Sequence, residues 1–177
     1  RSAFATGVGV ARTSSAGRLF DAVAGLIGLR QRAAFEGQAA MELEFAAMDA
    51  IDPHAYPFGL DGETVDWAPM VAAIECDRRK GDGVPRIARH FHSTLTEMIV
   101  AVAMREELPR VCLTGGCFQN VLLAETTIEA LRAKGLTTYW HQRVPPNDGG
   151  IALGQLVAAS RPRPRLVPTL ARSGDSM

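Results

Sequence analysis

Two short stretches of the chain carry paired glycines in a setting that favours anion binding. The first is RVCLTGGCFQN, from Arg110 to Asn120, and the second is VPPNDGGIALGQ, from Val144 to Gln155. Each follows or contains a segment typical of a short strand, over residues 111–114 and 136–141, and each leads into a helical pattern. Paired glycines let the backbone approach a ligand, and the N–H groups at a helix start attract phosphate.

Four residues of these two units could contact a ligand. If the strands are parallel, both loops lie at the same edge of the sheet, so Gly115 and Gly116 can share one ligand with the second glycine pair. Asn120, expected one turn into its helix, could reach a phosphate or a sugar hydroxyl. Asp148 is the only carboxylate of the second loop, and beside phosphates it would bind a divalent metal or polarise a nucleophile. The alternative is that Gly115 and Gly116 make a tight turn and that Asp148 caps the last helix.

Two helix starts nearer the N-terminus are further candidates. Gly17 precedes Arg18 and Asp21, which are three positions apart and therefore share a helix face. This pair belongs either to a ligand site or to a surface ion pair. Gly37 allows close approach at the next helix start, and Glu42 could accept ribose hydroxyls or lie on a solvated face.

The histidines do not predict a metal centre. His90 and His92 are two positions apart, so on a regular helix they diverge by about 200° and cannot bind one metal together. His54 lies in a proline-containing loop and His141 at a strand end. No role follows for either from the sequence.

The composition excludes several function classes. The chain has 177 residues, 47% of them hydrophobic and 21% charged, with a net charge of +0, so no basic surface calls for nucleic acid or membrane. No apolar run approaches the roughly 18 residues of a membrane span, and no signal peptide is visible. The three cysteines form no CxxC pair, and we expect Cys112 in the core and Cys117 near the first glycine pair. These features predict a cytoplasmic protein.

Hydrophobic periodicity predicts the elements that position these residues. Helices are expected over residues 15–27, 36–50, 66–80, 85–107, 118–134 and 149–160, with a loop over 51–66. The order strand, helix, strand predicts a right-handed βαβ unit with parallel strands. Residues 1–13 are expected to be irregular or a weak edge strand, residues 1–160 one domain, and residues 161–177 a disordered tail. Two strands are too few for a stable open sheet, so more are expected in residues 1–13 or upstream of them.

Four motifs in consistent order resemble the C-terminal part of the HypF carbamoyltransferase family. They are TSSAGRLFDAVA over residues 13–24, FEGQAAMELE over 35–44, LTGGCFQN over 113–120 and VPPNDGGIALGQ over 144–155. More distantly, the chain is similar to tRNA threonylcarbamoyltransferases and O-carbamoyltransferases, which share the actin-like two-lobe ATPase fold. The resemblance implies a helix-rich α/β fold, the second lobe of an actin-like (ribonuclease H-like) ATPase with a short parallel βαβ core.

The resemblance also implies a reaction and a set of site residues. The family binds ATP as carbamoyl adenylate and transfers the carbamoyl group to the C-terminal cysteine of the partner HypE during [NiFe]-hydrogenase maturation. By similarity, Gly17 and Asp21 would meet the ribose or phosphate side of the nucleotide, and Gly37 and Glu42 its ribose. Gly115, Gly116 and Asn120 would line its phosphate and adenosine. Asp148 would bind a divalent metal.

Departures from the family pattern limit what the chain is expected to do alone. It lacks the His-rich motif that supplies metal ligands in the family, and it lacks the adenylate-forming, zinc-finger and acylphosphatase-like domains. We therefore expect a second lobe without its first lobe, inactive by itself and able to self-associate through the exposed interface. The alternatives are a non-catalytic nucleotide-binding or interaction lobe and an O-carbamoyltransferase of the same superfamily. The four motifs do not suit the sugar pocket of a kinase.

Overall fold

A computed structural model of the chain describes residues 13–161. Its helices are α2 (Ala16–Leu26), α3 (Gln38–Met48), α4 (Ala68–Lys80), α5 (Val84–Arg105), α6 (Val121–Ala133) and α7 (Ile151–Ser160). Its strands are β1 (Gly59–Asp61), β2 (Thr64–Asp66), β3 (Arg110–Leu113) and β4 (Thr137–Trp140). The edge strand considered for residues 1–13 falls almost entirely outside the described residues, as does the tail predicted after residue 161.

Local signals set the ends of α2 and the end of α4 as predicted. Ser15 is the N-cap of α2, where its hydroxyl accepts a hydrogen bond from the Arg18 N–H at 3.4 Å. Gly28 follows that helix with a φ of 77°. At the end of α4, basic residues precede Gly81, whose φ of 87° places it in the left-handed region that ends many helices.

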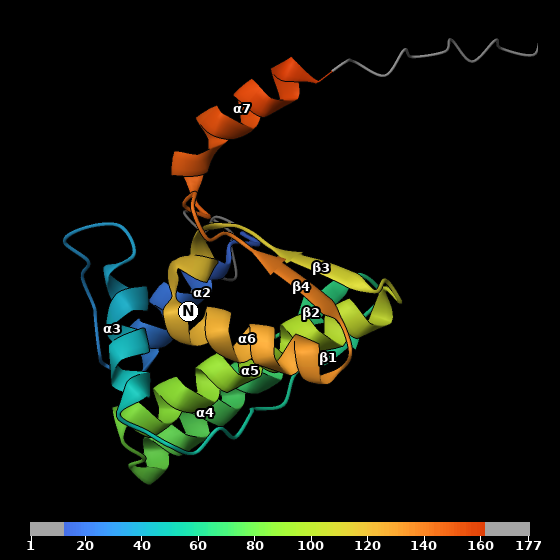
Figure 1. The fold of residues 1–177 in the computed structure, drawn as a ribbon. Coiled ribbons are helices and arrows are strands. Elements are labelled where there is room, and N and C mark those ends of the chain that lie inside the picture. Colours follow the sequence, from blue (N-terminus) through green and yellow to red (C-terminus); the bar gives the residue numbers. More distant parts are fainter. Residues whose placement is uncertain (1–12, 162–177) are drawn as a thin grey trace, which may run out of the picture.

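Helix α5 forms the centre of the described chain, and it contacts α3, α4 and α6 (Figure 1). Its Phe91 is fully buried and packs edge-on against Phe20 of α2, with ring centroids 5.0 Å apart. A second apolar cluster joins α5, β3 and α6 through Val100, Leu113, Ile128 and Leu131. Burying a side chain of this size stabilises the fold by about 1.5–3 kcal/mol.

The parallel βαβ unit is confirmed, because β3 pairs with β4 in parallel and α6 connects them. The register pairs Arg110 with Thr137 and Leu113 with Trp140. Side chains alternate along each strand, and Leu113 and Thr138 are buried. The expectation that Cys112 lies in the core is wrong: it is exposed, because its neighbours on the strand take the inward positions.

The loop predicted over residues 51–66 is wrong at its end, where β1 and β2 form an antiparallel hairpin. Asp61 pairs with Thr64, so the connection has two residues, and the first, Gly62, has a φ of 54°. A glycine at that position is typical of a tight hairpin turn. The guanidinium of Arg105 donates to the Gly62 carbonyl and ties the hairpin to the end of α5.

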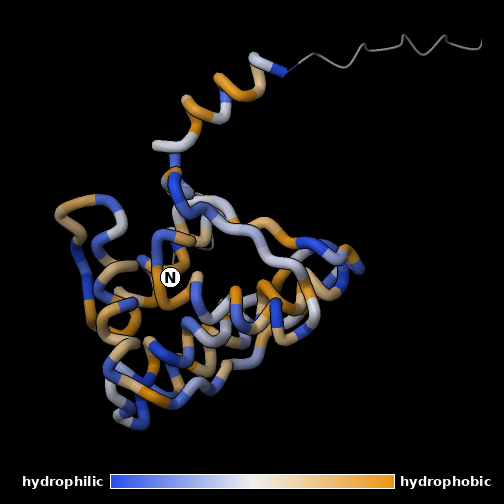
Figure 2. Tube along the Cα trace, viewed as in Figure 1, coloured by the Kyte–Doolittle hydropathy of each residue, from blue (hydrophilic) through white to orange (hydrophobic). Residues whose placement is uncertain are grey.

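Helix α7 projects away from the rest of the described chain (Figure 1). All its residues are exposed, and its substantial contact among the described elements is with the 3-10 helix η2 (Asp148–Gly150) that precedes it. Figure 2 shows mostly apolar residues along it. Whether residues 1–160 form one domain therefore stays a prediction. Among the helices described, none has the length and apolar character needed to cross a bilayer.

Candidate functional site

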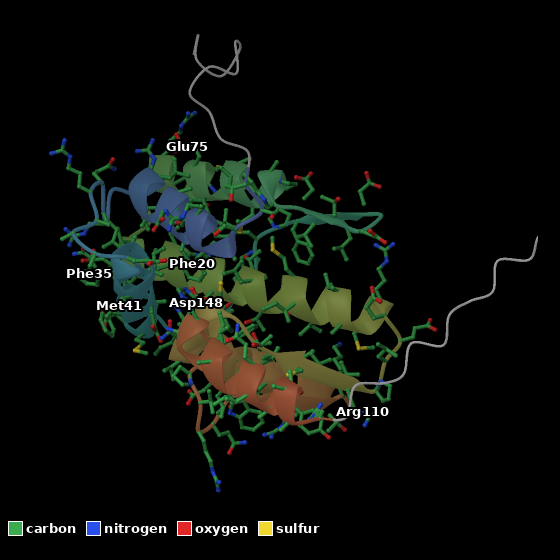
Figure 3. The ribbon with its side chains drawn as sticks, turned by 90° about the horizontal axis from the view of Figure 1, so that it is seen from above. Phe20, Phe35, Met41, Glu75, Arg110 and Asp148 are labelled. Atoms are coloured by element: carbon green, nitrogen blue, oxygen red, sulfur yellow. The ribbon has the colours of Figure 1, made fainter. Side chains whose placement is uncertain are left out.

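The two glycine loops meet at the carboxyl ends of β3 and β4, as the sequence predicts. The Gly115 N–H donates to the Pro146 carbonyl at 2.9 Å. A second link, 2.9 Å long, joins the Thr114 hydroxyl at the end of β3 to Nε2 of His141 at the end of β4. Figure 3 shows Asp148 at the opposite end of this sheet from Arg110, where β3 begins.

Glycine is required at two positions of these loops for different reasons. Gly115 has φ 105° and ψ 157°, a region that side chains essentially exclude. At Gly150 a Cβ atom would lie 2.8 Å from the Pro145 carbonyl oxygen, too close without a backbone shift. Gly116 has no such requirement, since the nearest atom to its Cβ position is Cβ of Asn147 at 4.0 Å. Each loop therefore requires glycine at one position, the first because of its backbone angles and the second because of its close packing on Pro145.

Asp148 does not cap the last helix, so that alternative is wrong. The neighbouring Asn147 caps η2, and its side chain accepts from the Gly149 N–H at 3.1 Å. Asp148 is exposed, and within residues 13–161 its carboxylate makes no ion pair or hydrogen bond. No group of three or more His, Cys, Asp or Glu side chains in the described part of the chain could hold a metal ion. The described residues alone therefore do not fit a metal centre.

Asn120 lies elsewhere in its helix than predicted. The residues after the glycine pair form the 3-10 helix η1 (Gly116–Gln119), and Asn120 is the N-cap of α6. Its Oδ1 accepts from the Leu123 N–H at 2.8 Å, and its Nδ2 lies 2.9 Å from Nε2 of His92. Only 7% of the residue is exposed. The side chain is therefore already bonded inside the protein and is not free to reach a ligand.

The candidates on α2 lie beside the first glycine loop, because α2 contacts η1. Gly17 is in the first turn of α2, and Asp21 forms an ion pair with Arg18 at 3.0 Å. Both side chains are partly exposed, so the surface ion pair is present and leaves Asp21 accessible.

The candidates on α3 have other partners. Gly37 is the N-cap of α3 with a φ of 81°. The Glu42 carboxylate accepts from Nε of Arg30 at 2.8 Å and from Nε2 of Gln38 at 3.0 Å. The hydrogen bond from Arg30 lowers the pKa of Glu42. No hydrogen bond or ion pair within the described residues joins Glu42 to the glycine loops.

Sequence reasoning missed Glu44 and His92, which are both buried beside the first loop. Oε1 of Glu44 accepts from the Val121 N–H at 2.6 Å and from the Leu122 N–H at 3.1 Å. No local signal marks Glu44, because its partners are amides of α6 that lie 77 and 78 positions further along the chain. The prediction that His90 and His92 diverge is confirmed, because His90 meets Asp52 at 3.2 Å while His92 meets Asn120.

Two hollows border the first glycine loop, and one of them also reaches the second. A cavity of about 60 Å³ lies between the strand ends, and the residues that line it are Leu113, Phe118, Ala124, Trp140, His141 and Pro146. It is far below the roughly 300–1,000 Å³ of a typical ligand pocket. A larger apolar groove of about 1180 Å³ runs along β3 between α2, α5 and the β1–β2 hairpin. The cavity between the strand ends is therefore too small for a typical ligand, and the larger groove is mainly apolar.

Comparison with known proteins identifies the family. Residues 1–155 match the family model described as "Carbamoyltransferase, Kae1-like Domain, second subdomain". The chain is 42% identical over 155 residues to the carbamoyltransferase HypF of Synechocystis, covering 85% of this chain and 20% of that protein. It is 40% identical over 163 residues to HypF of Rhodobacter capsulatus, covering 89% of this chain and 21% of that protein.

Two solved structures share the fold. A full-length HypF in its phosphate- and nucleotide-bound form matches with a TM-score of 0.81 and 39% identity, over 89% of this chain and 22% of that one. HypF of T. kodakarensis matches with a TM-score of 0.79 and 26% identity, over 89% of this chain and 21% of that one. The Kae1-like match is consistent with the predicted second lobe of an actin-like fold. The chain spans about a fifth of the length of these relatives, and it belongs to the HypF carbamoyltransferase family as the second subdomain of the Kae1-like domain.

Proposed function

We propose that the chain binds ATP, in the form of carbamoyl adenylate, at the edge formed by its two glycine loops. The observation that carries this proposal is the bond from the Gly115 N–H to the Pro146 carbonyl at 2.9 Å, which joins both loops at the strand ends. Ligands of open parallel sheets bind at this edge. The nucleotide-bound form of a similar HypF supports the same ligand class.

The reaction we propose is transfer of the carbamoyl group to the C-terminal cysteine of a HypE-like acceptor during [NiFe]-hydrogenase maturation. The acceptor thiolate attacks the carbamoyl carbon, a C–S bond forms, and the bond from that carbon to the phosphate oxygen breaks as AMP leaves. The part of this chain is to bind and orient the adenylate, which lowers the entropic barrier to the attack. A cytoplasmic setting fits this role and the three free cysteines.

The residues that we assign to this site have unequal support. Gly115 and Gly116 let the backbone approach the phosphate, and Gly17 and Asp21 stand on the helix beside them. Gly37 and Glu42 would meet the ribose. The Glu42 carboxylate would then bind the ribose hydroxyls while it also accepts the hydrogen bond from Arg30.

Asp148 is the residue of this chain that we propose as a ligand of a divalent metal. The family supplies the other ligands from outside these residues. The Asp148 carboxylate is exposed and has no partner among the described residues, so its oxygens are free to bind a metal ion.

We also propose that the natural partner of this lobe is the first lobe of the same polypeptide. The groove along β3 is apolar, and one face of it is built from Leu95, Met98, Ile99 and Val102 of α5. The exposed apolar α7 is a second surface that a packed neighbour would cover. Without that lobe, a non-catalytic nucleotide-binding or interaction lobe is the second candidate, because the chain spans only about a fifth of its relatives. An O-carbamoyltransferase would share the same nucleotide edge.

A titration of the chain with ATP, followed by two-dimensional NMR, tests the site. The amide signals of residues 115–116 and 148–150 should shift together, with weak affinity because one wall of the site is present. Calorimetry with added Mg²⁺ checks the metal assignment through Asp148→Ala. Tight, metal-dependent binding that survives this substitution would contradict the role of Asp148, and ATP-induced shifts confined to other parts of the chain would contradict the site itself.

A further inference from the structure

The N-terminus of α6, where the first glycine loop ends, is closed by side chains from inside the protein. The first amides of a helix have no partner within it. Here the Val121 and Leu122 N–H groups donate to Oε1 of Glu44, at 2.6 and 3.1 Å, and the Leu123 N–H donates to Oδ1 of Asn120 at 2.8 Å. The next amide, of Ala124, already bonds to the Asn120 carbonyl at 3.0 Å. No amide of the first turn is left for a phosphate.

Asn120 and His92 hold each other in one arrangement. Nδ1 of His92 lies 2.8 Å from the Ala88 carbonyl, which can only accept, so Nδ1 carries the proton. Nε2 is then the acceptor, and Nδ2 of Asn120 donates to it at 2.9 Å. Burial lowers the pKa of His92 to about 4, so the ring is neutral at neutral pH. In this pair of side chains, each ring nitrogen of His92 and each amide atom of Asn120 is therefore fixed as either a donor or an acceptor.

The same contacts fix the exit of the glycine loop. Glu44 and Asn120 are each 7% exposed and His92 is 1% exposed, so water does not compete for their bonds. The Asn120 N–H donates to the Cys117 carbonyl at 3.2 Å, and the Phe118 N–H donates to the Gly115 carbonyl at 3.1 Å. Asn120 thus joins the buried network to η1, which begins at Gly116.

We propose that Glu44, His92 and Asn120 are positioning residues for the Gly115–Gly116 turn. They hold the start of α6, and with it the end of the turn, in one conformation. They also bind the first amides of α6 to an internal carboxylate, which excludes a phosphate from that helix end. This inference rests on the proposed nucleotide binding at the turn, and it replaces a ligand contact by Asn120 with a role through its neighbours.

Three variants of the 177-residue chain separate positioning from simple stability. Glu44→Ala removes both bonds to α6. Glu44→Gln keeps an amide oxygen that can accept them. Ala47→Gly is the matched control, since it weakens the same helix at a fully buried position and removes neither hydrogen bond to α6. Asn120→Asp is a second test, because it keeps the cap but sets a carboxylate oxygen against Nε2 of His92 in place of the donor.

The readouts are amide hydrogen exchange, the NMR signals of Gly115 and Gly116 without ligand, and the affinity for ATP. In Glu44→Ala, exchange at Val121 and Leu122 should accelerate about tenfold or more, since hydrogen bonds to a charged group are lost. The two glycine signals should shift or split, and ATP should bind about tenfold more weakly. Glu44→Gln should restore most of each effect, and Ala47→Gly should leave the glycine signals and the ATP affinity unchanged. Asn120→Asp should also shift the glycine signals.

Two outcomes would overturn the proposal. If exchange accelerates in Glu44→Ala while the glycine signals stay in place, Glu44 is a helix cap and nothing more. If Ala47→Gly moves the same signals, general destabilisation explains them. A wild-type chain without any ATP-induced shift at the glycines would refute the nucleotide site alone, because the ligand-free glycine signals of Glu44→Ala still test the network.

Discussion

Replacing Gly115 with alanine should destabilise the protein through backbone strain alone. Its φ of 105° and ψ of 157° lie in a region that only glycine occupies readily. A Cβ atom there would meet nothing within 4 Å, so no steric clash contributes. The residue cannot easily rotate to a better conformation, because its N–H donates to Pro146 and its carbonyl accepts from Phe118.

The expected loss follows from two opposing terms. Backbone strain of this kind costs about 1–3 kcal/mol, while alanine stabilises by about 0.4–1 kcal/mol because it restricts the unfolded chain. The net loss is therefore about 1–2 kcal/mol. For a chain of this size, each kcal/mol lowers the Tm by about 2–4 °C, so the Tm should fall by about 2–8 °C.

Thermal unfolding followed by circular dichroism measures this change, with Gly116→Ala as the control. Gly116 is not among the glycines with positive φ, and its Cβ position has no neighbour closer than 4.0 Å. The Gly116→Ala variant should unfold at the wild-type Tm or above it, with a gain of up to about 1 kcal/mol in the free energy of unfolding. If Gly115→Ala unfolds at the wild-type temperature, or both variants lose equally, strain at the turn is not the reason for glycine.

Three further predictions concern the core, a buried histidine and the last helix. Phe91→Ala should lower the free energy of unfolding by about 3–5 kcal/mol, whereas Phe45→Ala on α3, at a side chain 59% exposed, should change it by under about 0.5 kcal/mol in urea titrations. The pKa of His92 is lowered in the folded state to about 4, below its ordinary 6.5, so the unfolded chain binds more protons between these values. Stability from this group is complete above pH 6.5 and should fall by about 3 kcal/mol as the pH drops to 4, and His92→Gln should flatten that profile in urea titrations at several pH values. Truncation after Gly150 should change the stability by under about 0.5 kcal/mol, since α7 contacts little besides η2; a clear drop in Tm would show that α7 packs elsewhere in solution.

Local signals account for the parts of the fold that were predictable. Ser15 begins a helix as its N-cap, and Gly28 and Gly81 follow helix ends with positive φ angles. These signals depend only on residues close in the sequence. The shared edge of the two glycine loops followed from parallel pairing, a general rule of βαβ units. The family motifs then agreed with the comparisons that identify the HypF family.

Some errors came from signals that were present but weighted wrongly. In the strand RVCL, Val111 and Leu113 share one face, so alternation places Cys112 on the other. Asn is a preferred N-cap, and taking Asn120 as the helix start would have given the correct boundary of α6. The two-residue turn at Gly62 similarly indicated the hairpin.

Other features could not be read from the sequence, because distant elements create them. Glu44 could face solvent on α3 until that helix packs near α6. Glu42 is also a glutamate and lies two positions before Glu44, yet its carboxylate pairs with Arg30 and not with α6. Which of the two carboxylates is buried depends on the docking of α3 against α5, which no local pattern encodes.

The cap that Glu44 places on α6 has a consequence for the order in which the protein folds. It joins residues 77 positions apart, and the first turn of α6 contains no acidic residue of its own. Contacts between such distant residues form slowly, because a long loop must close first. We therefore expect the start of α6 to fray until α3 has docked, and Glu44→Ala to act mainly on the rate of unfolding. On this expectation, the glycine loop acquires its final shape late in folding.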